Sequence, residues 1–205
     1  RKPSQEKIDH ILNLFKSNKI QQALDFIETL SKDYPDNSLL LNIRGACYAA
    51  LGQLDIAVQY YEKALSIKPD YAKAHYNLGI ALQELGKLRD SVKSYENSIA
   101  LEPENAQAHN NLSILLRELD QLEKAEASCR KAIVLDPEYA EAYSSLSIIL
   151  YANGHLNSAL ESIEKAYSIN PKLKLIKLLL AILKARKNRD TNDVSDRNIS
   201  RSNFN

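Results

Sequence analysis

The segment Tyr71–Pro103 has the sequence YAKAHYNLGIALQELGKLRDSVKSYENSIALEP, and its pattern indicates the fold of the whole chain. It reads as a helix, a tight turn at Gly86, a second helix and a closing proline. Proline has no amide hydrogen and restricts the residue before it, so helices commonly end there. The stretch therefore predicts two antiparallel helices joined by a short turn.

The same pattern recurs every 34 residues along the chain. The prolines at this spacing are Pro35, Pro69, Pro103, Pro137 and Pro171. The turn position is equally regular, and it is occupied by Asn18, Gly52, Gly86, Asp120 and Gly154. These residue types tolerate the left-handed backbone found just past a helix C-terminus. Because a fixed period of about 20–50 residues marks a repeat protein, we expect stacked helical hairpins.

Small residues form a third register with the same period. The first helices carry Gly45, Gly79, Ser113 and Ser147. The second helices carry Ala57, Ser91, Ala125 and Ala159. Small side chains at facing positions let paired helices approach closely. Larger apolar residues lie between them at the 3.6-residue period of an amphipathic helix.

With these registers, the chain resembles the tetratricopeptide-repeat family. The central unit carries the family's small residue, turn, second small residue, aromatic residue and proline at Gly79, Gly86, Ser91, Tyr95 and Pro103. The resemblance implies an all-α, right-handed superhelical solenoid of antiparallel helix hairpins, with a C-terminal capping helix. The predicted repeats, which together make up residues 4–173, are 4–37, 38–71, 72–105, 106–139 and 140–173.

Residues 172–187, KLKLIKLLLAILKARK, predict one further helix in the place of that cap. Its apolar residues cover roughly 220° of a helical wheel, whereas docking on one neighbour needs only about 100°. Three interpretations stay open: burial against the last repeat, docking of another domain or a second copy, and binding to a membrane surface. Leu175, Leu179 and Ile182 are the candidates for self-association. Residues 188–205 are polar with little to bury, so we expect a disordered tail.

Composition narrows the classes of function. The 205 residues carry a formal net charge of +1, which argues against a nucleic-acid partner. No apolar run reaches the length of about 18 residues that a membrane span requires. Cys47 and Cys129 lie in apolar helical patterns and are expected to be reduced, buried thiols. We therefore expect a cytoplasmic protein.

Catalytic motifs are missing from the sequence. It contains no HExxH, CxxC or GxSxG motif, and the glycines and lysine within residues 79–87 have the wrong spacing for a phosphate-binding loop. His75 and His109 share a repeat position, but no third ligand is obviously placed to complete a zinc site with them. We predict that the chain is not an enzyme and has no catalytic residue, metal site or cofactor.

The resemblance implies that the first helix of each hairpin lines a concave groove. Transferred by repeat position, the candidate peptide-binding residues of this groove are Asn42, Lys73, Tyr76, Asn77, Ile80, Gln107, Asn110, Asn111, Ile114, Arg117, Ser144, Ser145 and Tyr151.

Asn77 and Asn111 occupy one repeat position and form a short asparagine ladder in the sequence. A carboxamide both donates and accepts hydrogen bonds, so it can bind a peptide backbone without reading its side chains. The repeats are similar here to those of O-linked N-acetylglucosamine transferase, which carry such a ladder. Ile43 and Ser145 interrupt the ladder in this chain. The alternative is that both asparagines are solvated consensus residues.

These patterns predict a non-catalytic scaffold that binds a protein or an extended peptide segment. One alternative is the substrate-recruiting domain of a larger transferase-type enzyme. The other is an oligomerisation module assembled as a homo-oligomer through residues 172–187.

Overall fold

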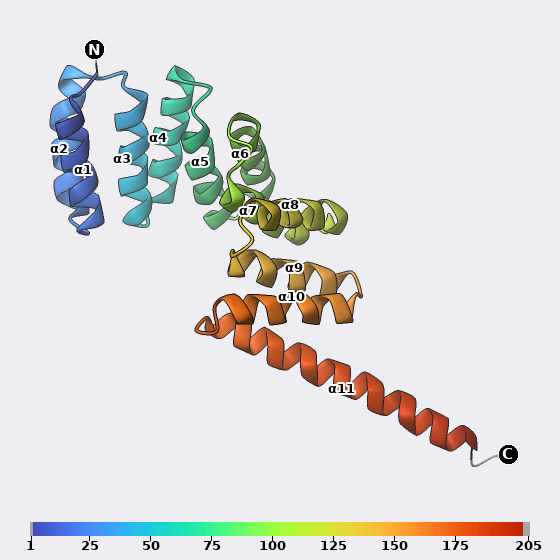
Figure 1. Ribbon diagram of the computed structural model, residues 1–205. Helices are drawn as coiled ribbons and strands as arrows, with labels where there is room; N and C mark the ends of the chain where they lie inside the picture. Colours follow the sequence, from blue (N-terminus) through green and yellow to red (C-terminus); the bar gives the residue numbers. More distant parts are fainter. Residues whose placement is uncertain (1, 203–205) are drawn as a thin grey trace. The chain divides into compact units, whose positions relative to one another are not determined.

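The computed structural model describes the backbone of residues 2–202 and the side chains of residues 2–191. Within those residues the chain forms eleven α-helices and no strand (Figure 1). This confirms the all-α prediction. The helices are α1 (Gln5–Lys16), α2 (Ile20–Asp33), α3 (Ser38–Ala50), α4 (Leu54–Ile67), α5 (Ala72–Glu84), α6 (Leu88–Leu101), α7 (Ala106–Glu118), α8 (Leu122–Leu135), α9 (Ala140–Ala152), α10 (Leu156–Ile169) and α11 (Lys174–Ser202).

The helices fall into two compact units, residues 1–104 with α1–α6 and residues 105–205 with α7–α11. In both units consecutive helices pair as hairpins, and each hairpin lies within one of the predicted repeats. No helix in the described part of the chain is long and apolar enough to cross a membrane.

The turns of the hairpins have the backbone that the sequence predicts. At Gly86, φ is 73°, and the amide of Lys87 donates to the carbonyl of Leu82 at 2.8 Å. This bond satisfies a carbonyl that the end of α5 would otherwise leave unpaired. Positive φ values between 56° and 81° occur at all five predicted turn positions: Asn18, Gly52, Gly86, Asp120 and Gly154.

Within the first unit, glycines of the first helices are covered by tyrosine rings of the second helices. A Cβ atom placed on Gly79 would lie 2.9 Å from Cε1 of Tyr95, and one on Gly45 would lie 2.6 Å from Cε1 of Tyr61. Both contacts are shorter than real Cβ atoms tolerate. The glycines therefore give the tyrosine rings the room to pack on bare backbone.

The second unit fills the same positions with different residues. Ser113 and Cys129 stand where Gly79 and Tyr95 stand in the first unit, and both are fully buried. The Cys129 thiol donates to the carbonyl of Ala142 at 3.0 Å, which ties α8 to α9. A larger first-helix residue is thus matched by a smaller second-helix residue, so the interior stays close-packed.

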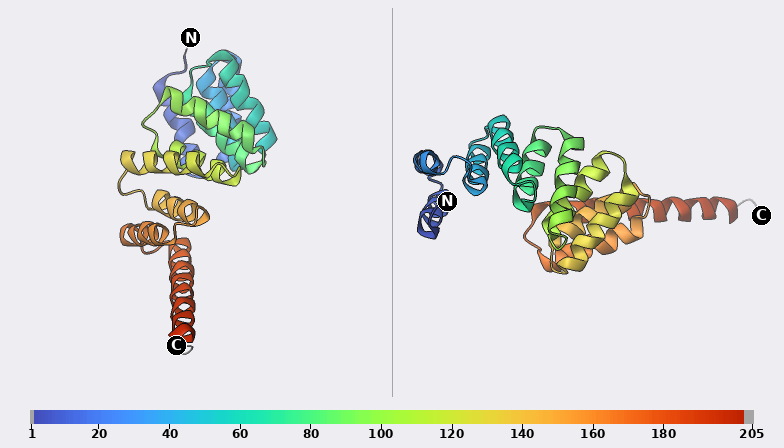
Figure 2. Two further views of the ribbon diagram at one scale, coloured as in Figure 1. Left: turned by 90° about the vertical axis from the view of Figure 1, so that its right-hand side faces the viewer. Right: turned by 90° about the horizontal axis from the view of Figure 1, so that it is seen from above.

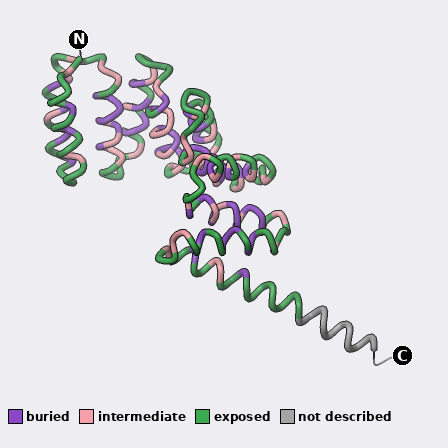
Figure 3. The backbone as a smooth tube through the Cα atoms, viewed as in Figure 1, coloured by how far each residue is buried: buried purple, intermediate pink, exposed green. Residues whose placement is uncertain are grey.

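The last helix, α11, begins beside α10 and continues beyond it (Figures 1 and 2). Ile176 and Leu183 are buried, and the ammonium group of Lys184 lies 3.2 Å from the carboxylate of Glu164 on α10. Residues 185–191 are exposed, and this part of the tube is green in Figure 3.

Here the structure differs from the sequence prediction of a helix over 172–187 followed by a disordered tail. The helix begins at Lys174 and continues to Ser202, and residues 203–205 of the predicted tail lie outside the described residues. No proline or glycine interrupts the sequence after Pro171. The ion pair of Arg186 with Asp190 at 3.3 Å also supports the helix past Lys187.

Candidate binding groove

The predicted groove residues of the first unit include a pair of asparagines bonded to each other. The side-chain nitrogen of Asn77 on α5 donates to Oδ1 of Asn42 on α3 at 3.0 Å. Asn42 is only 3% exposed. The amide group of Asn77 is therefore engaged with a neighbouring repeat of its own unit.

The other predicted residues of this unit flank that pair. Tyr76 is half-buried, and its ring centroid lies 5.7 Å from that of Tyr95. Ile80 is half-buried, and Lys73 is exposed.

A pocket of about 470 Å³ lies in the second unit between α7, α9 and the start of α11. The structure thus brings together most of the predicted groove residues of this unit. Two do not line the pocket: Gln107 and Tyr151, which are both exposed. Those that do are Asn110, Asn111, Ile114, Arg117, Ser144 and Ser145.

Apolar side chains make up much of the remaining wall. Ile148 and Ile149 follow the predicted serines on α9. Leu173 directly precedes the last helix, and Ile176 lies in its first turn. Leu175, a predicted self-association residue, also lines the pocket and is 58% exposed. Sequence reasoning assigned the last helix to capping or assembly and missed its part in the pocket. The one available signal was its excess apolar surface.

Two buried polar atoms in this wall have no hydrogen-bond partner among the described residues. They are Oδ1 of Asn110, in a residue that is 3% exposed, and Oγ of Ser144, in a residue that is 5% exposed. Buried polar groups of proteins are nearly always paired. Leaving one such group unpaired costs about 1–3 kcal/mol. Two unpaired groups at one pocket therefore make this pocket a candidate ligand site.

The repeat register explains why the Oδ1 atom of Asn110 is unpaired. Asn110 and Ser145 lie two periods after Asn42 and Asn77. In the first unit the donor to the buried asparagine is the carboxamide of Asn77. A serine side chain is shorter and carries no amide group, so position 145 leaves Oδ1 of Asn110 without that donor.

Charged groups of both signs lie at the pocket. The guanidinium of Arg117 is half-exposed and lies 3.9 Å from the carboxylate of Glu118, and Glu141 is exposed on α9. At this distance and exposure the ion pair is weak. Arg117 can therefore exchange partners at little cost.

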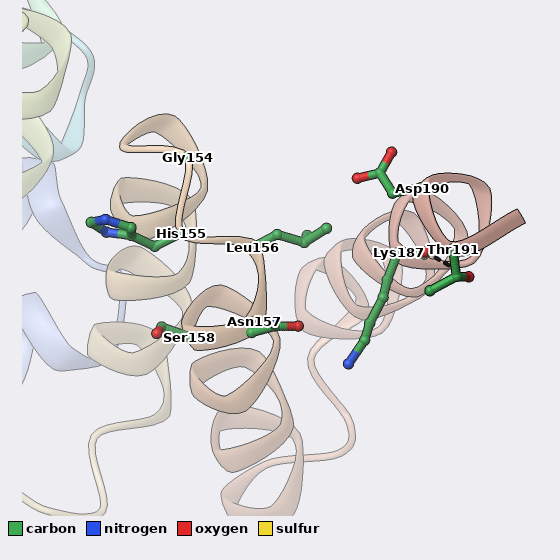
Figure 4. A pocket seen from close by; sticks show the side chains of 8 residues that line it. All are labelled: Gly154, His155, Leu156, Asn157, Ser158, Lys187, Asp190 and Thr191. Atoms are coloured by element: carbon green, nitrogen blue, oxygen red, sulfur yellow. Dashed lines mark hydrogen bonds between the residues drawn. The ribbon is translucent and has the colours of Figure 1, made fainter. Parts of the chain in front are cut away.

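A second, more open cleft of about 790 Å³ separates the start of α10 from the exposed part of α11. Leu156 and Asn157 point toward α11, whereas His155 and Ser158 point away from it (Figure 4). Lys187 extends from the opposite side (Figure 4). These side chains do not converge on one point, so this cleft is a poorer candidate site.

The buried thiols are poor nucleophiles. Burial raises the pKa of Cys47 to about 11 and that of Cys129 to about 12. The thiolate is the reactive form of cysteine, so both side chains are protonated and inert near neutral pH. The described side chains also contain no cluster of three or more histidine, cysteine or acidic residues suited to a metal ion.

Models of known families match most of the repeats. A TPR repeat model matches residues 45–86, and two tetratricopeptide-repeat models match residues 76–140 and 140–173. Together they cover more than half of the chain. This chain belongs to the tetratricopeptide-repeat family. Its first predicted repeat, residues 4–37, precedes the matched range.

Curated relatives of this tetratricopeptide-repeat chain include two peroxisomal targeting signal receptors. The receptor of Kluyveromyces lactis is 35% identical over 69 residues, which are 33% of this chain and 12% of the receptor. The receptor of Saccharomyces cerevisiae is 29% identical over 70 residues, 34% of this chain and 11% of the receptor. The chain thus spans about an eighth of the length of the relatives it matches.

Solved structures share the tetratricopeptide-repeat fold at low sequence identity. PilW, a type IV pilus biogenesis factor, superposes with a TM-score of 0.76 at 24% identity and covers 90% of this chain and 93% of its own. YrrB, described as a TPR protein with an unusual peptide-binding site, gives a TM-score of 0.72 at 20% identity, covering 90% and 92%. MamA gives 0.72 at 22% identity, covering 78% and 94%. These similarities support the fold.

Proposed function

We propose that this chain is a non-catalytic scaffold that binds protein or extended peptide segments in the pocket between α7, α9 and α11. The observation that carries the proposal is the pairing of an apolar wall with two unpaired buried polar atoms, Asn110 Oδ1 and Ser144 Oγ. Apolar pockets with a few convergent polar groups are the usual form of a ligand site.

The similarity to known proteins supports a protein-binding role. The chain consists largely of tetratricopeptide repeats, and it resembles part of receptors that are named for a targeting signal. YrrB, with the same fold, is named for a peptide-binding site. A peptide ligand is therefore the first class to test.

The test is selection of peptides from a random library displayed on phage, with the full 205-residue chain as bait. Peptides that bind the pocket should lose at least tenfold in affinity when Ile148→Glu places a charge in the apolar wall. The matched control is Val134→Glu on α8 of the same unit, because Val134 is 72% exposed and does not line the pocket. Equal affinity for both variants, measured by calorimetry, would refute the pocket as the site.

A second candidate function is self-association through α11. Leu175 and Leu178 are each 58% exposed, and Ile182 is 49% exposed. Their spacing of three and four residues forms one stripe on the helix. The sequence pattern also indicated Leu179 for self-association. Leu179 is half-buried, so the exposed Leu178 is the better candidate.

Light scattering tests this candidate with the double variant Leu178→Glu, Ile182→Glu. The wild-type chain should give twice the mass of the variant or more. A monomeric wild-type chain at 100-fold the working concentration would end the idea.

Three further expectations belong to the proposal. One is a recruiting role within a larger transferase, and it includes the similarity to repeats of O-linked N-acetylglucosamine transferase. Reading the coding sequence on both sides of the chain tests it. A cytoplasmic location is supported by the two free, buried cysteines, Cys47 and Cys129. The formal charge of +1 supports a protein partner over a nucleic acid.

A further inference from the structure

We infer that the pocket binds one bulky aliphatic side chain of an extended segment, together with the backbone amide next to it, which bonds to Asn110 and Ser144. This inference rests on the proposed function and adds the chemistry of the occupant.

The polar requirement comes from the Asn110 carboxamide. Its Oδ1 atom is an acceptor, so the occupant must supply an N–H or O–H donor. The Ser144 hydroxyl can donate one hydrogen bond and accept others. A peptide amide offers both a donor and an acceptor within one rigid group, which suits the two atoms together. A carboxylate or phosphate offers only acceptors to Oδ1 and is therefore excluded at this position.

The apolar requirement comes from the rest of the wall. Ile114 and Ile148 are contributed by α7 and α9. Leu173 directly precedes α11, and Ile176 lies in its first turn. A charged or strongly polar side chain packed against these four residues would be desolvated at the apolar wall. A pocket of about 470 Å³ has room for an aliphatic side chain of leucine size together with the backbone amide next to it.

In the first unit, the residues at the equivalent positions are hydrogen-bonded to each other. There the buried Asn42 receives its hydrogen bond from Asn77 at 3.0 Å. Serine at position 145 removes the internal donor from Asn110. The Oδ1 atom of Asn110 has almost no accessible surface, so an occupant bonds to it only when the side chains around it move. Replacing Ser145 by asparagine should rebuild the internal pair and compete with the occupant.

The experiment titrates blocked peptides into the isotopically labelled full chain and follows amide signals by NMR. The probes are acetyl-Ala-Leu-Ala-N-methylamide, its glycine analogue, and an analogue in which an ester oxygen replaces the leucine N–H. We expect saturable shifts for residues of α7 and α9 with the leucine peptide. The glycine and ester analogues should each bind at least fivefold more weakly.

Two variants test the role of the polar atoms. Ser145→Asn should weaken binding of the leucine peptide at least fivefold, and Ser144→Ala at least threefold. The matched control is the same exchange at an exposed site of this unit, Ser168→Asn on α10, which does not line the pocket and should leave the dissociation constant unchanged. The melting temperature of each variant shows whether it is folded, and Ser144→Ala keeps the test valid if Ser145→Asn disturbs packing.

Failure of this inference can be distinguished from failure of the proposed function. Equal affinities for the leucine, glycine and ester probes, or full affinity in both serine variants, would overturn the inference. The proposed function would still hold if Ile148→Glu abolished binding of the library-selected peptides. If Ile148→Glu also left those peptides bound, both would be refuted.

Discussion

The pair Asn42–Asn77 in the first unit and the pair Asn110–Ser145 in the second occupy equivalent repeat positions but differ in hydrogen bonding. In the first unit, a buried carboxamide oxygen is satisfied by an amide on the next first helix, at 3.0 Å. In the second, the equivalent oxygen is buried without a partner beside a pocket. The residue at position 145 thus determines whether the buried carboxamide oxygen is paired within the chain.

The repeat scaffold and the polar groups on its surface vary independently in this chain. The turn at Gly86 and the turn at Gly154 have the same left-handed backbone, with φ values of 73° and 81°. Hairpins of the same geometry therefore carry different polar groups on their first helices. Exchanging residues between the two units is the direct way to test this independence.

The largest effect is expected from exchanging the small residue of the central hairpin. Gly79→Ser imports the residue of the second unit, but the new Cβ would lie 2.9 Å from the Tyr95 ring. Such overpacking should lower the free energy of unfolding by about 2–3 kcal/mol. Urea denaturation measures this change. Restoring stability by adding Tyr95→Cys would confirm the steric cause, and an unchanged midpoint in Gly79→Ser would contradict it.

A smaller loss is expected when the closed asparagine pair is opened. Asn77→Ser removes the donor to the buried oxygen of Asn42, which should cost about 1–2 kcal/mol of unfolding free energy. Thermal unfolding followed by circular dichroism detects this loss. The double variant Asn42→Leu, Asn77→Leu removes both polar groups and should recover part of it. If Asn77→Ser left the stability unchanged and the double leucine variant lost stability, the hydrogen bond between the two asparagines would not be stabilising.

The reciprocal exchange in the second unit should stabilise the protein slightly. Ser145→Asn supplies the donor that Asn110 lacks, and one net hydrogen bond contributes about 0.5–1.5 kcal/mol. The gain should disappear when Asn110 is replaced by alanine in the same background. A double-mutant cycle in urea measures the coupling between the two positions, and zero coupling would rule out the pairing.

The smallest effect concerns the thiols, one in each unit. Burial raises the pKa of Cys47 to about 11 and that of Cys129 to about 12, so both remain protonated below pH 9 in the folded chain. Each thiol therefore favours the folded state below its unfolded pKa, and that contribution is lost as the pH rises through the folded pKa. A disulfide reagent at pH 8 should label neither residue until its unit opens. Rapid labelling of Cys47 or Cys129 in the folded protein would show that this thiol is accessible without unfolding.

Local rules explain why much of the fold was predictable. Pro103 and Gly86 impose backbone constraints that hold in any context, and their period exposes the whole hairpin series. The hydrogen-bond partner of Asn77 was harder to predict from the sequence. The bonded residues on neighbouring first helices are 35 residues apart, whereas the repeat period is 34 residues. The part of Ile176 in the pocket depends on how α11 meets α9 after Pro171, which no repeat register describes.

The last helix has a mechanical consequence. Its 29 residues give it a length of roughly 44 Å, and its first turns form one wall of the pocket. Leu175 and Ile176 lie in the first turn of this helix, so one continuous helix connects the pocket wall to the exposed residues beyond Lys184. A partner bound along the exposed part of α11 would therefore be attached directly to an element of the pocket.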